Sequence, residues 1–246
     1  MRWMWCAACA ACTACGRLGF SQTDAIADVS DSVADVSLPV LAPVQTTIGS
    51  QDMLPTALSI HPALTGSGHS LVIIAAIDTA SQNLSGVFDD AGNTWQRILD
   101  GSDAGLTGRI EIWFVARANP VTDVSLTFTT GLERALAVQL TEWSGLSDQS
   151  PVVGFNLPPA AMSNTPTTGV ASVAAPSLLL GATAIGGTPI TTSLTTAGGV
   201  MLTPFGHTNI TGAAAYRVVS PDDYELAWML GESRYHTAGI IALRLE

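Results

Sequence analysis

Apolar and polar residues alternate along several short runs of the chain. The alternation is regular over residues 109–118, 124–129 and 224–230, where nearly every second side chain is apolar. A period of two places successive side chains on opposite faces of a β-strand. These runs therefore predict strands with one face in a core and the other face wet or partly wet.

Other runs are apolar throughout, as central strands buried on both faces are. Residues 71–77 and 178–185 have this character, and apolar runs at 135–143 and 236–246 close two successive stretches of the chain. After Leu38 the runs are short and are interrupted by Gly, Pro, Asn and Asp, which is typical of a sandwich or barrel. Only residues 131–140 compete as a helix, and their β-branched and aromatic neighbours favour a strand.

The part of the chain after Leu38 consists of two halves whose features follow the same order. Ser70–Ile73 and Ser177–Leu180 each open an apolar run. Three later residues have counterparts in the second half: Leu126, Gly131 and Arg134 correspond to Leu226, Gly231 and Arg234. We therefore predict an all-β fold, a two-sheet antiparallel jelly-roll-like sandwich built from two echoed halves over residues 38–246. Two separate small sandwiches are the alternative.

Residues 1–37 differ in character and are interpreted as an N-terminal arm. Residues 1–16 are rich in alanine and cysteine and are a candidate short helix, and residues 21–37 form an acidic linker of small residues. The first sixteen residues also share a basic residue and a short apolar run with secretory leaders, which are cleaved.

Four cysteines lie three residues apart in this arm, at Cys6, Cys9, Cys12 and Cys15. The spacing resembles the ligand run of bacterial ferredoxins, so an iron–sulfur cluster or a zinc ion is one interpretation. The ferredoxin pattern ends with a proline after the last cysteine, whereas Gly16 follows Cys15 in this chain. The alternatives are small apolar side chains along one helix face and disulfide bonds between copies of the chain.

The charge of the chain excludes some partners. Nine arginines and no lysine stand against twenty carboxylates, which gives a net charge of −11. Phosphate backbones and anionic lipid surfaces repel such a chain, so nucleic acid is not an expected partner. No apolar stretch reaches the length of roughly 18 residues that a membrane-spanning helix needs.

The most distinctive segment is Phe88–Trp95, with the sequence FDDAGNTW. Gly92 and Asn93 suit a tight turn, and aspartates there accept backbone hydrogen bonds. This segment follows the apolar run at 70–77 and precedes the runs at 112–116 and 142–145. That order resembles a β-sandwich of tailed-phage virion proteins and of secreted bacterial proteins. The resemblance covers roughly residues 45–246 and implies a sandwich exposed on a particle or outside a cell.

Two kinds of ligand are considered for this region. Asp89 and Asp90 are candidate calcium ligands, because calcium binds carboxylate and carbonyl oxygens; turn formation is the alternative. Two tryptophans are candidate platforms for a sugar ring, since an exposed indole can stack on a glycan. These are Trp113 and, as a second candidate, Trp95.

Signatures of catalysis are few, so the protein is not expected to be an enzyme. The chain has no Gly-x-Ser-x-Gly elbow, and its four histidines lack metal-ligand spacing. Glu111 and Glu142 could form the carboxylate pair of a glycosidase. The alternative is that both glutamates simply lie on the solvent-exposed faces of strands.

These observations favour a non-enzymatic structural or interaction protein. We expect a phage virion component, a head-decoration or tail protein, which acts through self-association and docks on other virion or surface proteins as a homo-oligomer. The alternative is a secreted carbohydrate-binding module with a calcium site. The expected location is the virion, or the extracellular space or cell surface.

Overall fold

The computed structural model describes residues 38–52, 56–79, 81–102, 108–131, 134–187, 190 and 194–246. Every regular element in these ranges is a β-strand. The same ranges contain no helix that is long and apolar enough to cross a membrane. The predicted all-β antiparallel sandwich is confirmed, and the predicted arm at 1–37 lies outside the described residues.

Two large antiparallel sheets face each other. The first sheet contains, in spatial order, β1 (Gln45–Gln51), β8 (Leu136–Trp143), β3 (Ser70–Ile77), β6 (Arg109–Val115) and β5 (Gln96–Ser102). The second sheet contains β9 (Val152–Asn156) and β10 (Ala161–Ser163), both on β19 (Arg234–Arg244), then β12 (Ser177–Gly186) and β16 (Ile210–Val219), which pairs with β14 (Val200–Met201) and β15 (Phe205–His207).

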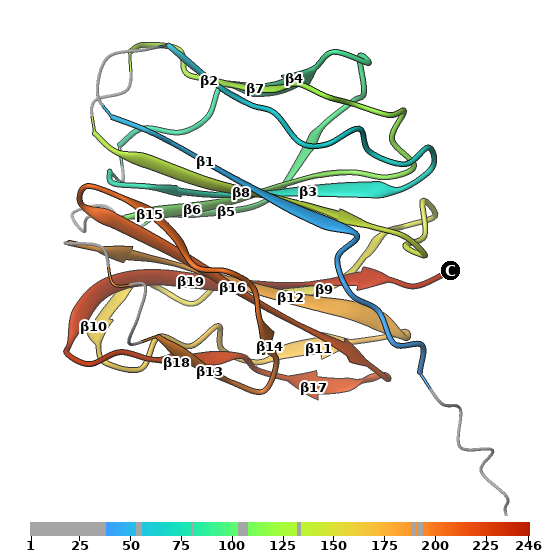
Figure 1. The fold of residues 1–246 in the computed structure, drawn as a ribbon. Helices are drawn as coiled ribbons and strands as arrows, with labels where there is room; N and C mark the ends of the chain where they lie inside the picture. Colours follow the sequence, from blue (N-terminus) through green and yellow to red (C-terminus); the bar gives the residue numbers. More distant parts are fainter. Residues whose placement is uncertain are drawn as a thin grey trace, which may run out of the picture. The chain divides into compact units, whose positions relative to one another are not determined.

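A smaller layer covers the outer face of each large sheet. The first outer layer contains β2 (Ala57–Ile60), β7 (Val124–Thr127) and β4 (Gly86–Asp89). The second consists of two ribbons, β11 (Ala171–Val173) with β17 (Asp222–Tyr224) and β13 (Thr195–Ala197) with β18 (Ala227–Met229). Residues 38–246 thus form four layers (Figure 1), two more than the sandwich itself requires.

Three hydrophobic cores fill the spaces between these layers. The central core receives Val72, Ile74, Phe114 and Trp143 from the first sheet and Leu178, Leu180 and Ile241 from the second. The outer cores hold the opposite faces of the same strands: Leu71, Ile73 and Trp113 pack with Leu126, and Leu179, Ala213 and Ile240 pack with Leu226. This explains why β3 and β12 are almost entirely apolar, since both of their faces are covered.

The covering layers correct one prediction. Alternation along residues 109–118 predicted a wet face carrying Glu111 and Trp113, but both side chains are buried, with exposed fractions of 0% and 8%. The reason is that the first outer layer packs on that face. The alternation in β7 and over residues 224–230 does match their burial, because these segments belong to outer layers whose other face meets solvent.

The two echoed halves have the same strand order. The order β1-β8-β3-β6-β5 of the first sheet corresponds to β9-β19-β12-β16-β14 of the second. Leu126 and Leu226 are fully buried in the corresponding outer cores. The echo between Ser70–Ile73 and Ser177–Leu180 is displaced by one residue, however: Leu71 faces an outer core whereas Leu178 faces the central one. Because the halves share the central core, they form one unit.

Candidate functional site

The Phe88–Trp95 segment is organised by a single carboxylate. Oδ1 of Asp89 accepts hydrogen bonds from the backbone N–H groups of Ala91 and Asn93, both at 3.0 Å. Oδ2 of Asp89 accepts from the Asn93 amide at 3.1 Å and from the Trp95 indole N–H at 2.8 Å. Gly92 supplies the positive φ that this turn needs. The aspartate therefore acts as the acceptor that shapes the turn.

The neighbouring residues join this turn to the loop between β6 and β7. Asn93 receives a hydrogen bond from the Asn119 backbone N–H at 2.8 Å and donates one to its carbonyl at 3.1 Å. Asp90 accepts from the Thr122 hydroxyl at 2.6 Å. That hydrogen bond holds the pKa of Asp90 below its ordinary value, so its carboxylate stays ionised. The motif thus clamps two loops together.

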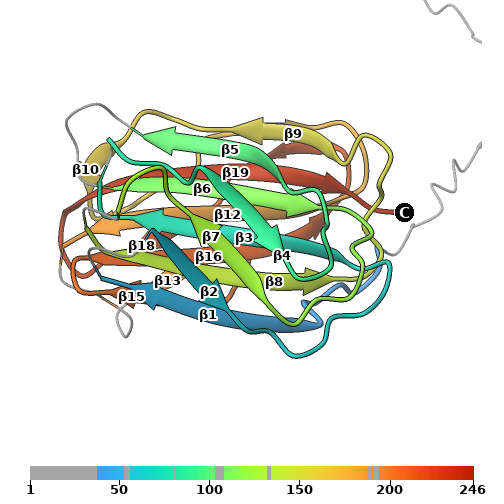
Figure 2. The ribbon, with the colours of Figure 1, turned by 90° about the horizontal axis from the view of Figure 1, so that it is seen from above.

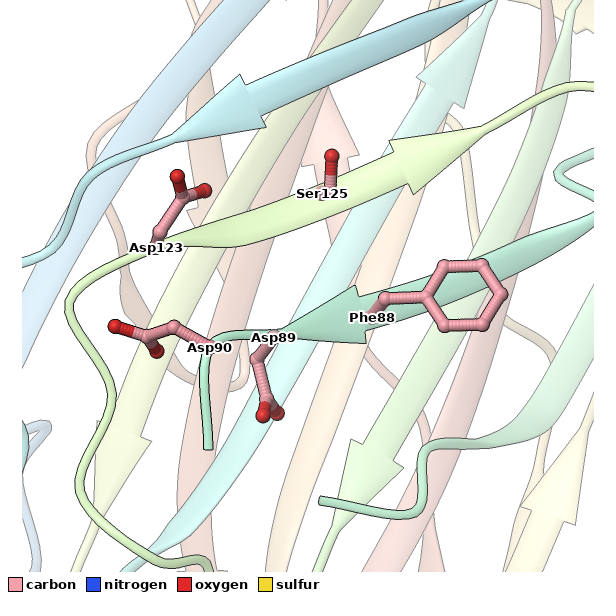
Figure 3. Close-up of a pocket in the computed structure, with 5 residues that line it drawn as sticks. All are labelled: Phe88, Asp89, Asp90, Asp123 and Ser125. Carbon is pink, nitrogen blue, oxygen red and sulfur yellow. The ribbon is translucent and has the colours of Figure 1, made fainter. Parts of the chain in front are cut away.

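A shallow hollow of about 230 Å³ lies on the outer face of β4 and β7 (Figure 3). Its lining consists of Phe88, Asp89, Asp90, Asp123 and Ser125. The three carboxylates point in different directions, and those of Asp89 and Asp90 are already occupied by the donors of their own loops. No group of three or more metal-binding side chains occurs among the described residues. The hydrogen bonds show Asp89 and Asp90 in turn formation, and calcium binding at this pair stays a prediction.

The tryptophans proposed as sugar platforms are both buried. Trp95 and Trp113 are each 8% exposed, and their indole N–H groups donate to Asp89 and Glu111. The expectation of an exposed Trp113 is therefore wrong, because the first outer layer covers its ring. The exposed aromatic ring of this layer is that of Phe88, at 59%. Period two puts Val87 with Asp89 on one face of residues 86–89 and Phe88 with Gly86 on the other, and the sequence alone does not show which face meets solvent.

Glu111 is the buried member of a charged cluster at the β5 side of the first sheet. Its carboxylate accepts from Nε of Arg109 and from the Trp113 indole, both at 2.9 Å. Arg97 lies 3.7 Å from the same carboxylate and 5.6 Å from the Trp113 ring centre. Burial nevertheless raises the pKa of Glu111, since desolvation outweighs these favourable contacts.

Glu142 is another buried carboxylate of the first half. It accepts hydrogen bonds from the Gly66 backbone N–H at 2.7 Å and from Gln45 at 2.6 Å, and it lies 2.5 Å from Nδ1 of His69. Burial opposes ionisation of Glu142, but the hydrogen bonds outweigh it and lower its pKa. The carboxylate ties the loop before β3 to β1 and β8. No sequence motif signals this contact, because its partners lie far apart along the chain.

The register and the separate hydrogen-bond partners do not bring Glu111 and Glu142 together as a glycosidase pair. Glu111 is opposite Ala75 on one side of β3, and Glu142 is opposite Leu71 on the other side. Four residues along the strand and two strand spacings across place their Cα atoms about 16 Å apart. Glycosidase carboxyl groups stand about 5–9.5 Å apart. The wet-face explanation of the two glutamates is wrong as well, since both are buried.

The four cysteines, Cys6, Cys9, Cys12 and Cys15, lie outside the described residues, so their proposed roles stay predictions. Comparison of the chain with protein families, curated proteins and solved structures finds no match.

Proposed function

We propose that this protein is a non-enzymatic structural component of a tailed-phage virion, of the head-decoration or tail class, which works by self-association and docking. The observation that carries the proposal is an open strand edge. Among the described residues, β1 pairs with β8 on one side only and forms a margin of the first sheet (Figure 2). An open edge presents unpaired N–H and C=O groups that another strand can bind.

β1 has the properties of a docking strand. It has seven residues, with the sequence QTTIGSQ, and contains neither a charge nor a proline. Its register with β8 is continuous, without a bulge. Ile48 is 44% exposed, and Val44 just before the strand is 54% exposed. Soluble proteins normally protect an edge of this length with charges, prolines or bulges.

The other margins of the large sheets have these protections. β5 has a register shift between Arg97 and Leu99 and contains the Arg97–Asp100 ion pair. Each margin of the second sheet is divided between two short strands. One margin consists of β9 and β10, with two prolines between them, and the other consists of β14 and β15, with Pro204 between them. Among the described strands, β1 therefore stands out as a long and unprotected edge.

The motif order supports the assignment to a virion. The FDDAGNTW turn and the strands around it resemble the sandwich of tailed-phage virion proteins, and in this chain the turn residues serve to clamp loops. A shell or tail component needs a rigid scaffold and interaction edges, and three packed cores provide such a scaffold.

The first experiment places a charge on the proposed docking strand. Ile48→Lys is expected to convert the associated full-length protein to single copies, because a lysine on an edge strand opposes pairing with another strand. Sedimentation velocity over a range of concentrations measures the change. Phe155→Lys is the matched control, since Phe155 is an exposed apolar residue on β9, at a margin of the second sheet. Wild-type protein that sediments as single copies at every concentration contradicts the proposal.

A carbohydrate-binding module is the second candidate, and the exposed Phe88 ring favours it. The ring lies beside a hollow rimmed by Asp90 and Asp123, and aromatic faces with nearby carboxylates suit sugar rings. If this candidate is right, a glycan array shows binding that Phe88→Ala abolishes and that Met229→Ala, a change at another exposed apolar residue, preserves. An array without any bound glycan eliminates it.

A further inference from the structure

The sequence of β1 reads nearly the same in both directions. Around Ile48, position 47 is threonine and 49 is glycine, positions 46 and 50 are threonine and serine, and positions 45 and 51 are both glutamine. In an antiparallel pair of identical strands, a two-fold axis at one residue places it opposite its own copy and places its flanking residues opposite each other. An axis at Ile48 therefore pairs isoleucine with isoleucine, glutamine with glutamine, and small residues with small residues between them.

Alternate residues of β1 lie on two different faces, one covered by the first outer layer and one exposed. Gln45, Thr47 and Gly49 lie on the face towards the first outer layer, where a Cβ on Gly49 would collide with Ile60 of β2. Thr46, Ile48 and Ser50 lie on the other face and are exposed. The exposed row thus has one apolar residue at its centre and a hydroxyl group at each side.

We propose that β1 binds β1 of a second copy, antiparallel and with the two-fold axis at Ile48. The inference rests on the proposed function, since it names the partner of the same strand. On the exposed face, Ile48 packs against its copy and Thr46 lies opposite Ser50 of the second copy. Such isoleucine and hydroxyl pairs are favourable across antiparallel strands. The two first sheets become one continuous sheet.

Charge also favours a second copy at this edge. The chain carries a net charge of −11, so most of its surface repels another copy of itself. β1 has no charged residue, and the carboxylate that follows it, Asp52, is turned to partners in its own chain. It accepts a hydrogen bond from the Thr208 hydroxyl at 2.6 Å and lies 3.6 Å from Nε2 of His207. Two copies can therefore approach along β1 without facing like charges along the strand.

The register is tested with cysteine variants of the full-length protein. Ile48→Cys, treated with a short linker that joins two thiols, is expected to give a peptide pair in which both members are linked through position 48. Ser50→Cys is the matched control: in the proposed register the two copies of position 50 stand about 13 Å apart, four residues along the strands. We expect at least about ten-fold less cross-linking between two copies of position 50 than between two copies of position 48. Mixing Thr46→Cys with Ser50→Cys chains restores the cross-link.

Mass spectrometry of the linked peptides separates the outcomes, with circular dichroism to verify folding. A dominant pair between copies of position 48, together with the product of Thr46→Cys and Ser50→Cys chains, supports the proposal. A dominant pair between copies of position 50 overturns the register. Linkage of position 48 to Cys6, Cys9, Cys12 or Cys15 shows that the N-terminal arm occupies the edge instead, and overturns the second copy as the partner. Oligomers without any linkage through position 48 overturn this inference and leave the proposed function intact, whereas single copies at every concentration overturn both.

Discussion

Replacing Trp143 with alanine is expected to lower the free energy of unfolding by about 3–5 kcal/mol, as for other fully buried tryptophans. Trp143 is completely buried in the central core, in contact with both large sheets. Its ring packs edge-on against the Tyr216 ring of the second sheet, with 5.1 Å between the ring centroids. Its indole N–H donates a hydrogen bond to the Thr141 hydroxyl at 2.9 Å. The substitution removes these contacts and opens a cavity at the junction of the halves. Urea unfolding followed by far-ultraviolet circular dichroism measures the loss.

Phe88→Ala is the matched control for this prediction. It also removes an aromatic ring, but one that is 59% exposed, so its effect is expected to stay within about 1 kcal/mol. Equal losses for the two variants contradict the packing described for the central core.

Glu142→Ala is expected to destabilise the protein by about 3 kcal/mol at neutral pH. The substitution removes the acceptor shared by the Gly66 N–H, the Gln45 amide and the His69 ring, at a site that is 1% exposed. The loop before β3 then loses its link to β8. Glu142→Gln keeps one acceptor oxygen and is expected to lose less. Denaturant unfolding compares the two variants, and an unchanged stability of Glu142→Ala contradicts the role given to this carboxylate.

The two buried glutamates are expected to respond to pH with opposite signs. Because the folded pKa of Glu142 lies below its ordinary value of 4.5, its stabilising effect is full above that value and is lost as the pH falls through the folded pKa. The folded pKa of Glu111 is raised, so its carboxyl group favours the folded state below 4.5 and loses this effect as the pH rises through the raised pKa.

Denaturant unfolding of the wild type, Glu142→Gln and Glu111→Gln tests both directions. The free energy of unfolding is measured from about pH 3.5 to about pH 8, a range that includes the ordinary carboxyl pKa. The advantage of the wild type over Glu142→Gln is expected to grow with pH, and its advantage over Glu111→Gln to shrink. Parallel curves for the two variants contradict the assigned directions.

The central strands were predictable from the sequence, because their signal is local. Continuous apolar runs identified β3 and β12, and the apolar runs at 135–143 and 236–246 correspond to β8 and β19. The echo of the halves was visible too, because Leu126 and Leu226 occupy equivalent buried positions. What the sequence could not show is which faces are covered. The first outer layer buries Glu111 and Trp113, and its strands pair residues that are far apart along the chain.

The candidate site was predictable only where its contacts are local. The turn role of Asp89 follows from the order of residues 88–95, since all four of its donors lie within six positions. The link from Glu142 to His69 spans 73 positions, and no local pattern reports such a contact. The open edge of β1 is likewise a property of the sheet order, which the seven residues of β1 do not determine alone.

The unequal margins of the first sheet limit how far an assembly can grow. The proposed pairing at Ile48 uses the unprotected edge of both copies, so the joined sheet ends on each side at β5, with its register shift and its Arg97–Asp100 ion pair. A third copy finds no further strand of the β1 kind. Pairing by a two-fold axis is closed, so the product is a discrete ten-stranded dimer, twice the five strands of the first sheet. In the proposed dimer, the register shift in β5 thereby keeps the joined sheet from growing into a fibre.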